Sequence, residues 1–387
     1  MTTATLDAPA WIDKKRHLWV LGFFIILLPF VGVAIAEQTG GSIFYWLGPI
    51  FGYTVIPLAD FLIGTDASNP PDSAVAELER DRYYRYMVYA AVAAEYAVWI
   101  WGLALIAHGG LSLFEQIGLM VSIGGITGTS INTAHELGHK TDPFERWLAK
   151  IALAPVAYGH FYVEHNRGHH VRVATPEDPA SARFGEGFWE FLPRVVFGSV
   201  KSAWELEKKR LARSGKGPWT IANDNLQAWA MTLVLFGATV AWLGWAVLPF
   251  IIGQAIYGFS LLESVNYMEH YGLVRQKLPD GRYERCQPQH SWNSNHIVSN
   301  LFLYQLQRHS DHHAYPLRSY QALRHFDESP QLPTGYAPMI LLAYVPPLWF
   351  RLMDPKVVAH HKGDMSKANI KPSIRDEVIA RYRAQAA

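Results

Sequence analysis

The chain has 387 residues, of which 50% are hydrophobic and only 17% are charged, and its net charge is +1. An ordinary soluble domain contains about 25% charged residues, so this composition favours a membrane protein, and the near-zero net charge argues against a nucleic-acid-binding protein. The single cysteine, Cys286, excludes an internal disulfide and any iron–sulfur or rubredoxin-type centre ligated by several cysteines of this chain. Electrons for any redox reaction would have to come from another polypeptide.

The positions of lysine and arginine predict membrane hairpins. Three apolar stretches, 17–79, 86–139 and 217–274, contain no Lys or Arg and are 54–63 residues long. One spanning helix needs about 20 residues, so each stretch fits two helices and a short turn. The turn signals "EQTGGS", "AHGGLS" and "WLGWAVLP" lie inside the three stretches. We therefore predict six transmembrane helices near residues 18–37, 42–63, 86–107, 112–134, 225–244 and 248–268.

This arrangement places all 34 Lys and Arg residues on one side of the membrane, which the positive-inside rule assigns to the cytoplasm. The predicted fold is an all-α membrane protein. Its six-helix region, residues 1–270, contains a cytoplasmic insertion at about 140–224, and residues 271–387 form a cytoplasmic C-terminal region. The apolar segment 335–353 is interrupted by Pro346 and Pro347, so we expect it to lie at the membrane interface and not to form a seventh span.

Histidines cluster where the predicted spans reach the cytoplasm. The stretch "INTAHELGHK" contains H-E-x-x-H, with His135, Glu136 and His139. In zinc peptidases, the two histidines of this motif hold the metal and the glutamate activates a water molecule. The stretches "EHNRGHH", "NYMEHYGL" and "LQRHSDHHAYP" contribute seven more residues: His165, His169, His170, His270, His309, His312 and His313.

The spacing of these histidines predicts a shared metal site. Residues three or four positions apart on a helix share a face, so each multi-histidine cluster can aim two imidazoles at one point. We expect this of the pairs His135/His139 and His165/His169 and of the triplet His309/His312/His313. Nine converging histidines are too many for one metal and suit two metals with four or five ligands each. We expect the cytoplasmic segments to form a helical cap that completes this dinuclear site.

Several metals and reactions fit such a site. Ligation by nitrogen without cysteine suits iron, copper or zinc. A dinuclear hydrolase and an intramembrane zinc protease therefore both stay open, although a catalytic zinc needs only three protein ligands and the protease would leave at least seven clustered histidines without a role. Each cluster also lies near a carboxylate that could orient an imidazole or bind a metal directly: Glu136, Glu164, Asp178, Glu269 and Asp311.

Taken together, the four histidine motifs resemble the integral-membrane alkane hydroxylases (alkane 1-monooxygenases), which are related to the membrane fatty-acyl desaturases and xylene monooxygenases. The wider superfamily pattern, H-x(3,4)-H followed twice by H-x(2,3)-H-H, matches the first, second and last clusters. The motif "NYMEHYGL" is similar to alkane hydroxylases specifically. The likeness runs from about residue 11 to about residue 380, and His160, His290 and His296 match no ligand position of the family.

The resemblance implies two iron ions held by the nine histidines and O2-dependent terminal hydroxylation of medium-chain n-alkanes to primary alcohols. It also implies that electrons from NAD(P)H arrive through rubredoxin reductase and rubredoxin. The expected location is the bacterial inner membrane, with the metal site on the cytoplasmic side. A membrane fatty-acyl desaturase is the nearer alternative, and an intramembrane zinc protease is the more distant one.

Two features inside the predicted spans have more than one interpretation. Gly124 and Gly128 form a GxxxG motif, which indicates either close helix packing or a thin helix wall that leaves room for an alkyl chain. Glu95 lies near the middle of the third predicted span, where an acidic residue indicates a function by default, but its role is open.

Overall fold

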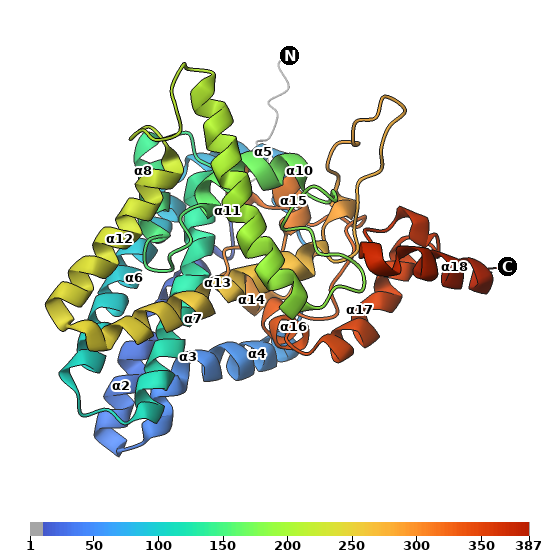
Figure 1. Cartoon of the computed structure of the whole chain (residues 1–387). Coiled ribbons are helices and arrows are strands. Elements are labelled where there is room, and N and C mark those ends of the chain that lie inside the picture. Colours follow the sequence, from blue (N-terminus) through green and yellow to red (C-terminus); the bar gives the residue numbers. More distant parts are fainter. Residues whose placement is uncertain (1–10, 387) are drawn as a thin grey trace, which may run out of the picture.

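The computed structural model describes residues 11–386, so the first ten residues of the predicted 1–270 region and Ala387 lie outside the described part. Within this range every regular element is a helix, and the only pairings of extended backbone are four isolated β-bridges. The all-α fold predicted from the sequence is therefore confirmed (Figure 1).

Helical segments occupy all six predicted transmembrane positions, with ends within four residues of the predicted ones. In the described range, five of them are long and apolar enough to cross a membrane. They are Arg16–Thr39 (η1, α1, η2 and α2), Ser42–Ile63 (η3, α3, η4 and α4), Arg82–His108 (α6), Asp224–Leu243 (α12) and Trp245–His270 (η6 and α13). The sixth segment, α7 (Leu113–Gly138), has 26 residues but is less apolar than the other five.

Helix α7 is less apolar because it lies inside the bundle. It begins at a capping box formed by Ser112 and Glu115, and it packs against α13, α6 and α3. An added Cβ atom at Gly124 would lie 2.7 Å from the carbonyl oxygen of Gln254, and one at Gly128 would lie 2.7 Å from that of Gly258. Both glycines therefore let the α7 and α13 backbones approach closely, as the helix-packing interpretation of the GxxxG motif predicts. A helix that faces other helices needs no lipid-like surface.

The hairpins bring one end of each spanning helix to the same side of the bundle. Tight turns at the opposite side contain glycines in the left-handed conformation, with φ of 72° at Gly40 and 85° at Gly244. Consequently the ends of α7 and α13 lie on the same side as the beginnings of α6 and α12. The segments that follow the second span, α7 and α13 therefore all begin on this side.

The segment between α7 and α12 contains α8 (Pro143–Ala152), α9 (Phe161–Glu164), the π-helix η5 (His165–His169), α10 (His170–Arg172) and α11 (Phe188–Ala212). Helix α5 (Asp72–Arg80) precedes α6. The C-terminal region contains η7 (Pro288–His290), α14 (Ile297–Phe302), α15 (His309–Ala314), η8 (Tyr320–Ala322), α16 (Tyr336–Ala343), α17 (Pro346–His360), η9 (Met365–Lys367), η10 (Pro372–Ile374) and α18 (Arg375–Ala386). In Figure 1, the red helices α17 and α18 lie at the edge of the molecule farthest from the blue N-terminal hairpin.

The predicted interfacial segment 335–353 forms α16 and the first half of α17. Pro346 and Pro347 lie in the first turn of α17, where a missing backbone N–H removes no helical hydrogen bond. Met339, Ala343 and Trp349 are buried in a cluster that also contains Tyr267 and Met268 of α13. These two helices thus pack against the end of α13 that leads to His270.

Candidate metal centre

All nine histidines predicted from the sequence converge, and they form two groups that could each hold a metal ion. The first group has five members, His135, His139, His165, His170 and His312, and the second has four, His169, His270, His309 and His313. Within each group the candidate ligand atoms lie within 4.8 Å of one another. Helices from both halves of the chain contribute to both groups, so neither forms without the complete fold.

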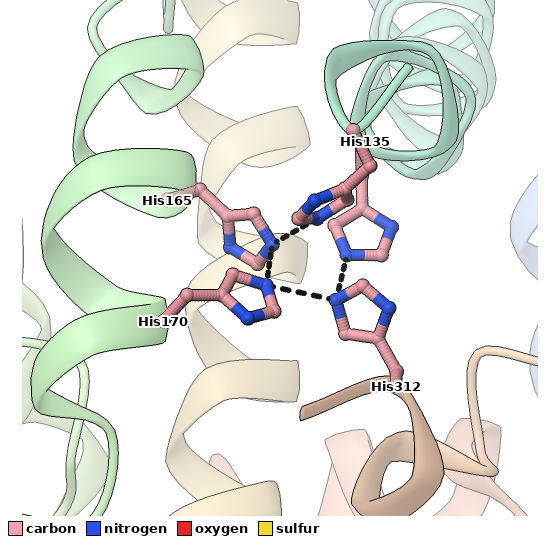
Figure 2. Close-up of side chains that lie close together, drawn as sticks. His135, His165, His170 and His312 are labelled. Atoms are coloured by element: carbon pink, nitrogen blue, oxygen red, sulfur yellow. Dashed lines mark hydrogen bonds between the residues drawn. The ribbon is translucent and has the colours of Figure 1, made fainter. Parts of the chain in front are cut away.

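In the first group the Nε2 atoms face a common centre. His312 Nε2 lies 2.8 Å from His135 Nε2 and 2.9 Å from His170 Nε2. His165 Nε2 lies 3.0 Å from His170 Nε2 and 3.1 Å from His139 Nε2. Figure 2 shows His135, His165, His170 and His312 pointing toward one another from three separate segments. The second group is similar, because His313 Nε2 lies 2.7 Å from His309 Nε2 and 3.2 Å from His169 Nε2.

The local helix type decides which histidines share a group. An α-helix would place His165 and His169 on one face, as predicted from their spacing. Instead, these residues form the π-helix η5, in which positions five apart align. His165 and His170 therefore belong to the first group and His169 belongs to the second, so the predicted pairing of His165 with His169 is wrong.

The buried polar atoms fit metal ions. Neither ring nitrogen of His270 has a hydrogen-bond partner among the described residues, although the side chain is fully buried. An orphaned pair of this kind is costly unless a ligand satisfies it. Burial also lowers the pKa of His165, His309 and His312 well below the usual value for histidine. These imidazoles are consequently neutral at physiological pH, which is the form that binds metals.

Two of the five predicted carboxylates contact a histidine of the site. Asp178 Oδ2 lies 3.0 Å from Nδ1 of His169 and accepts a second hydrogen bond from Ser181. It thus holds the ring from behind, on the side away from the other imidazoles. Glu269 Oε2 lies 3.0 Å from Nε2 of His309, the nitrogen that faces His313. The carboxylate of Glu269 therefore lies on the metal-facing side of the second group.

The other three carboxylates pair with basic residues. In the described structure, Glu136 pairs with Lys140 at 2.7 Å, Glu164 with Arg172 at 2.6 Å, and Asp311 with Arg318, in place of any imidazole. Burial raises the pKa of the Glu164 carboxyl to about 7 even though Ser202 and Arg172 oppose the shift. These acids hold the segments that present the histidines, but they do not touch the rings.

The histidines without a family position lie outside both groups. His160 packs edge-on against Tyr158 with ring centroids 4.3 Å apart. His290 accepts a hydrogen bond from the backbone N–H of Gln287, and His296 is hydrogen-bonded to Ser294. Their contacts are structural. Glu95 is completely buried in α6, and its two oxygens have no hydrogen-bond partner among the described residues.

An apolar cavity of about 160 Å³ leads to both histidine groups. Its walls come from the first two spans, α7, α13, α14 and α16, and His135, His165, Glu269 and His309 line the end at the metal centre. Gly125 lines it on α7, where an added Cβ atom would meet no described atom within 4 Å. The apolar cavity therefore ends at the two histidine groups.

Tyr336 is a site residue that the sequence did not indicate. It lies at the start of α16, lines the cavity, and donates a hydrogen bond from its hydroxyl to Glu269 Oε1. No motif marks it, because it reaches the site only through the contact between α16 and α13, which is a tertiary feature.

Replacing Asp178 by asparagine is expected to weaken metal binding and any activity that depends on it by about 10–100-fold, because a neutral amide oxygen is a weaker acceptor for His169 than the carboxylate. Glu164→Gln is a suitable control, since Glu164 is next to His165 in the chain but bonds Arg172. Elemental analysis of both purified variants tests the prediction. Equal metal content in Asp178→Asn and wild type would contradict it.

Comparisons with known proteins agree with this geometry. A family model described as fatty acid desaturase matches residues 112–343. The chain is 48% identical to an alkane 1-monooxygenase of Acinetobacter baylyi, over 96% of this chain and 92% of that protein, and 48% identical to one of Pseudomonas putida, over 98% and 95%. A xylene/toluene monooxygenase hydroxylase component of Pseudomonas putida is 29% identical over 65% of this chain and 68% of that protein. The family indicated by the histidine motifs is confirmed, and the chain belongs to the alkane 1-monooxygenase family.

Proposed function

We propose that this chain hydroxylates the terminal carbon of medium-chain n-alkanes, using O2 and a non-haem di-iron centre. The observation that supports this most directly is the apolar cavity that ends at both histidine groups. An alkane has no charge and no hydrogen-bonding group, so only an enclosed apolar space can bind it. The relatives whose names specify alkane 1-monooxygenation cover nearly the whole chain.

The group of five histidines would hold one iron and the group of four would hold the other. Nitrogen-only ligation of this kind suits iron, and the buried, neutral imidazoles are ready to bind without first losing protons. When bound, the two irons supply the reduction of O2 and the attack on the terminal C–H bond. Asp178 keeps His169 in the tautomer that presents Nε2 to the site.

The cavity residues bind and orient the alkane. Each buried methylene group contributes about 0.8 kcal/mol to binding, so affinity depends on the length of chain that the cavity accepts. The walls exclude water and present one end of the alkane to His135 and His309. At this end, Tyr336 donates its hydroxyl proton to Glu269 in a hydrogen bond, and this pair can hold or pass a proton beside the second group.

Electrons would come from rubredoxin, reduced by rubredoxin reductase at the expense of NAD(P)H. The only cysteine of the chain, Cys286, is buried, so the chain cannot supply an iron–sulfur donor of its own. Exposed basic residues on the side of the metal centre offer a docking surface for an acidic donor: Arg80, Arg82, Lys208 and Lys209.

The proposed topology has six transmembrane helices in the bacterial inner membrane. Five helices have the length and composition of spans, and α7 would be the sixth, shielded from lipid by its neighbours. The metal centre and the cap would then lie on the cytoplasmic side, because the basic residues are confined to the segments on that side.

The competing functions are less well supported. A zinc peptidase needs three protein ligands and a glutamate free to activate water, whereas His135 and His139 belong to a group of five and Glu136 pairs with Lys140. A fatty-acyl desaturase could use a similar centre. It would, however, need to place an internal methylene, rather than a terminal methyl group, at the end of the cavity.

Product analysis tests the proposed function. The purified protein in lipid nanodiscs, supplied with rubredoxin, rubredoxin reductase, NADH, octane and ¹⁸O2, is expected to form 1-octanol that contains ¹⁸O. Omitting rubredoxin should abolish the product. Formation of an alkene from an acyl substrate, with no alcohol from octane, would instead identify a desaturase.

Filling the cavity at Gly125 is expected to shorten the preferred alkane. A leucine at this position would project into open space and displace about two methylene groups, which corresponds to roughly tenfold lower activity on the longest substrates relative to the shortest. Gly237→Leu is the matched control, because Gly237 lies on the exposed face of α12 and also has no described atom within 4 Å of an added Cβ. Competition between alkanes of different lengths measures the shift, and an unchanged profile in Gly125→Leu would show that the cavity does not hold the substrate.

A further inference from the structure

A second cavity, of about 360 Å³, is lined by residues of α8, α9, η5, α11 and α12 and by none of the nine histidines. Helix α8 packs beside α12 at this place (Figure 1). Nothing in the proposed reaction uses it. Its lining residues are mainly basic and aromatic: Pro143, Arg146, Trp147, Lys150, Tyr162, Arg167, Arg210, Ala222, Asp224 and Gln227.

This cavity has more positive than negative charge. Its four cations, Arg146, Lys150, Arg167 and Arg210, face only two carboxylates, those of Glu207 and Asp224, which leaves an excess of two positive charges. The carboxylates are already fully engaged. Asp224 contacts Lys150 at 3.1 Å and Arg167 at 2.6 Å. Glu207 binds Arg167 and also Arg210, the latter at 2.6 Å.

Arg146 pairs with no carboxylate in the described structure and presents its charge to the cavity. Arg146 makes its one side-chain hydrogen bond in the described structure from Nε to the hydroxyl of Tyr162, at 2.7 Å, so both of its terminal amino groups can bind an anion. Lys150 is only 4% exposed, and its ammonium group lies 3.8 Å from the centre of the Trp147 ring. The ammonium group of Lys150 also donates hydrogen bonds to Asp224 and Gln227, so Lys150 adds positive charge to the cavity but has partners of its own.

Exposed apolar side chains lie close in the chain to the lining residues, and we call them the rim of the cavity. On α8, Phe144, Trp147 and Ile151 form one exposed stripe, and the loop before α12 exposes 80% of Trp219 and 89% of Ile221. This rim adjoins the first residue of the span Asp224–Leu243, at the level where a spanning helix leaves the hydrocarbon. Aromatic side chains are enriched at such levels because they combine an apolar body with a polar edge. The exposed stripe of α8 is therefore suited to the membrane interface.

We propose that this cavity binds the phosphate group of an anionic phospholipid, such as phosphatidylglycerol, from the leaflet on the side of the metal centre. The guanidinium of Arg146 and the ammonium of Lys150 would bind the phosphate oxygens, and the acyl chains would lie along Phe144 and Trp147. Inorganic phosphate would meet the same cations but would make no use of the apolar rim. A lipid satisfies both the charge and the rim.

Lipid binding to the purified full-length protein tests this proposal. Wild type, Arg146→Gln and Arg213→Gln would each be titrated in detergent with phosphatidylglycerol, phosphatidylcholine or inorganic phosphate. Native mass spectrometry reports the bound lipid, and the thermal unfolding midpoint reports stabilisation. Arg213 is the matched control because it is exposed at the end of α11 and does not line the cavity.

Wild type and Arg213→Gln are expected to retain phosphatidylglycerol in preference to phosphatidylcholine, and Arg146→Gln should bind it about tenfold more weakly, since it loses a charge-assisted hydrogen bond. Equal binding of the two lipids by wild type, or equal phosphatidylglycerol binding by all three proteins, would overturn the proposal. So would stabilisation by inorganic phosphate that equals that by phosphatidylglycerol and is lost in Arg146→Gln, because the site would then be a free-phosphate site. Arg146→Lys retains the positive charge but lacks the paired N–H donors of the guanidinium. Its affinity for phosphatidylglycerol should lie between those of wild type and Arg146→Gln.

Discussion

Replacing His270 by alanine is expected to remove the second iron and to lower alkane hydroxylation by more than about 100-fold. His270 supplies one of only four imidazoles in its group, and neither of its ring nitrogens has another partner among the described residues. A loss larger than the 10–100-fold effect of a supporting residue is expected, because here a ligand itself is removed. Iron content and octane turnover of the purified variant measure the effect.

The matched control for this substitution is His290→Ala. His290 is also buried, but it hydrogen-bonds backbone and belongs to neither group. The control should keep both irons, and its thermal stability would show how much a buried histidine contributes to folding alone. Full iron occupancy and normal turnover in His270→Ala would show that His270 is not a ligand of the metal centre.

The second large effect is expected within the H-E-x-x-H motif. His135→Ala should abolish measurable hydroxylation, because His135 belongs to the group of five and also lines the end of the substrate cavity. Glu136→Gln should retain measurable hydroxylation, because the Glu136 carboxylate pairs with Lys140, just past the end of α7, and contacts no imidazole in the described structure. Parallel turnover assays with octane and rubredoxin compare the two variants.

This pair of variants also separates an oxygenase from a peptidase. In a zinc peptidase the glutamate is the general base, so Glu136→Gln would keep the metal and lose all hydrolysis. Complete loss of hydroxylation by Glu136→Gln at full iron occupancy would show that the carboxylate has a direct role. Hydrolysis of a membrane peptide by wild type, lost in Glu136→Gln, would contradict the oxygenase function altogether.

Much of the fold followed from the sequence because lipid imposes simple rules. Stretches without Lys or Arg located the helices, and short glycine-containing turns located the hairpins. Helix α7 differed because hydropathy describes the surface that a helix exposes to lipid, and α7 is covered by α13, α6 and α3. The two interpretations of GxxxG needed the structure too, since Gly124 and Gly128 face α13 while Gly125, between them, faces the cavity.

The membership of the candidate site was more predictable than its arrangement. Histidine spacing identified the nine residues that converge. The π-helix at His165–His169, however, groups His165 with His170 instead of with His169, and the spacing of histidines alone does not distinguish a π-helix from an α-helix. Similarly, a position next to or shortly after a histidine cluster indicated both Asp311 and Asp178. Only Asp178 reaches a ring, because Arg318 pairs with Asp311. Tyr336 depends on a contact between distant helices and had no local signal.

The iron content of the purified wild-type protein tests whether the two histidine groups form a di-iron centre. Elemental analysis of protein produced in iron-rich medium, combined with Mössbauer spectroscopy of an ⁵⁷Fe-labelled sample, would count the metal ions and identify their ligand environment. Two histidine groups predict two irons per chain, both in nitrogen-rich, high-spin sites. One zinc per chain with no iron, in a protein that is folded and inserted in the membrane, would show that the two groups do not form a di-iron centre.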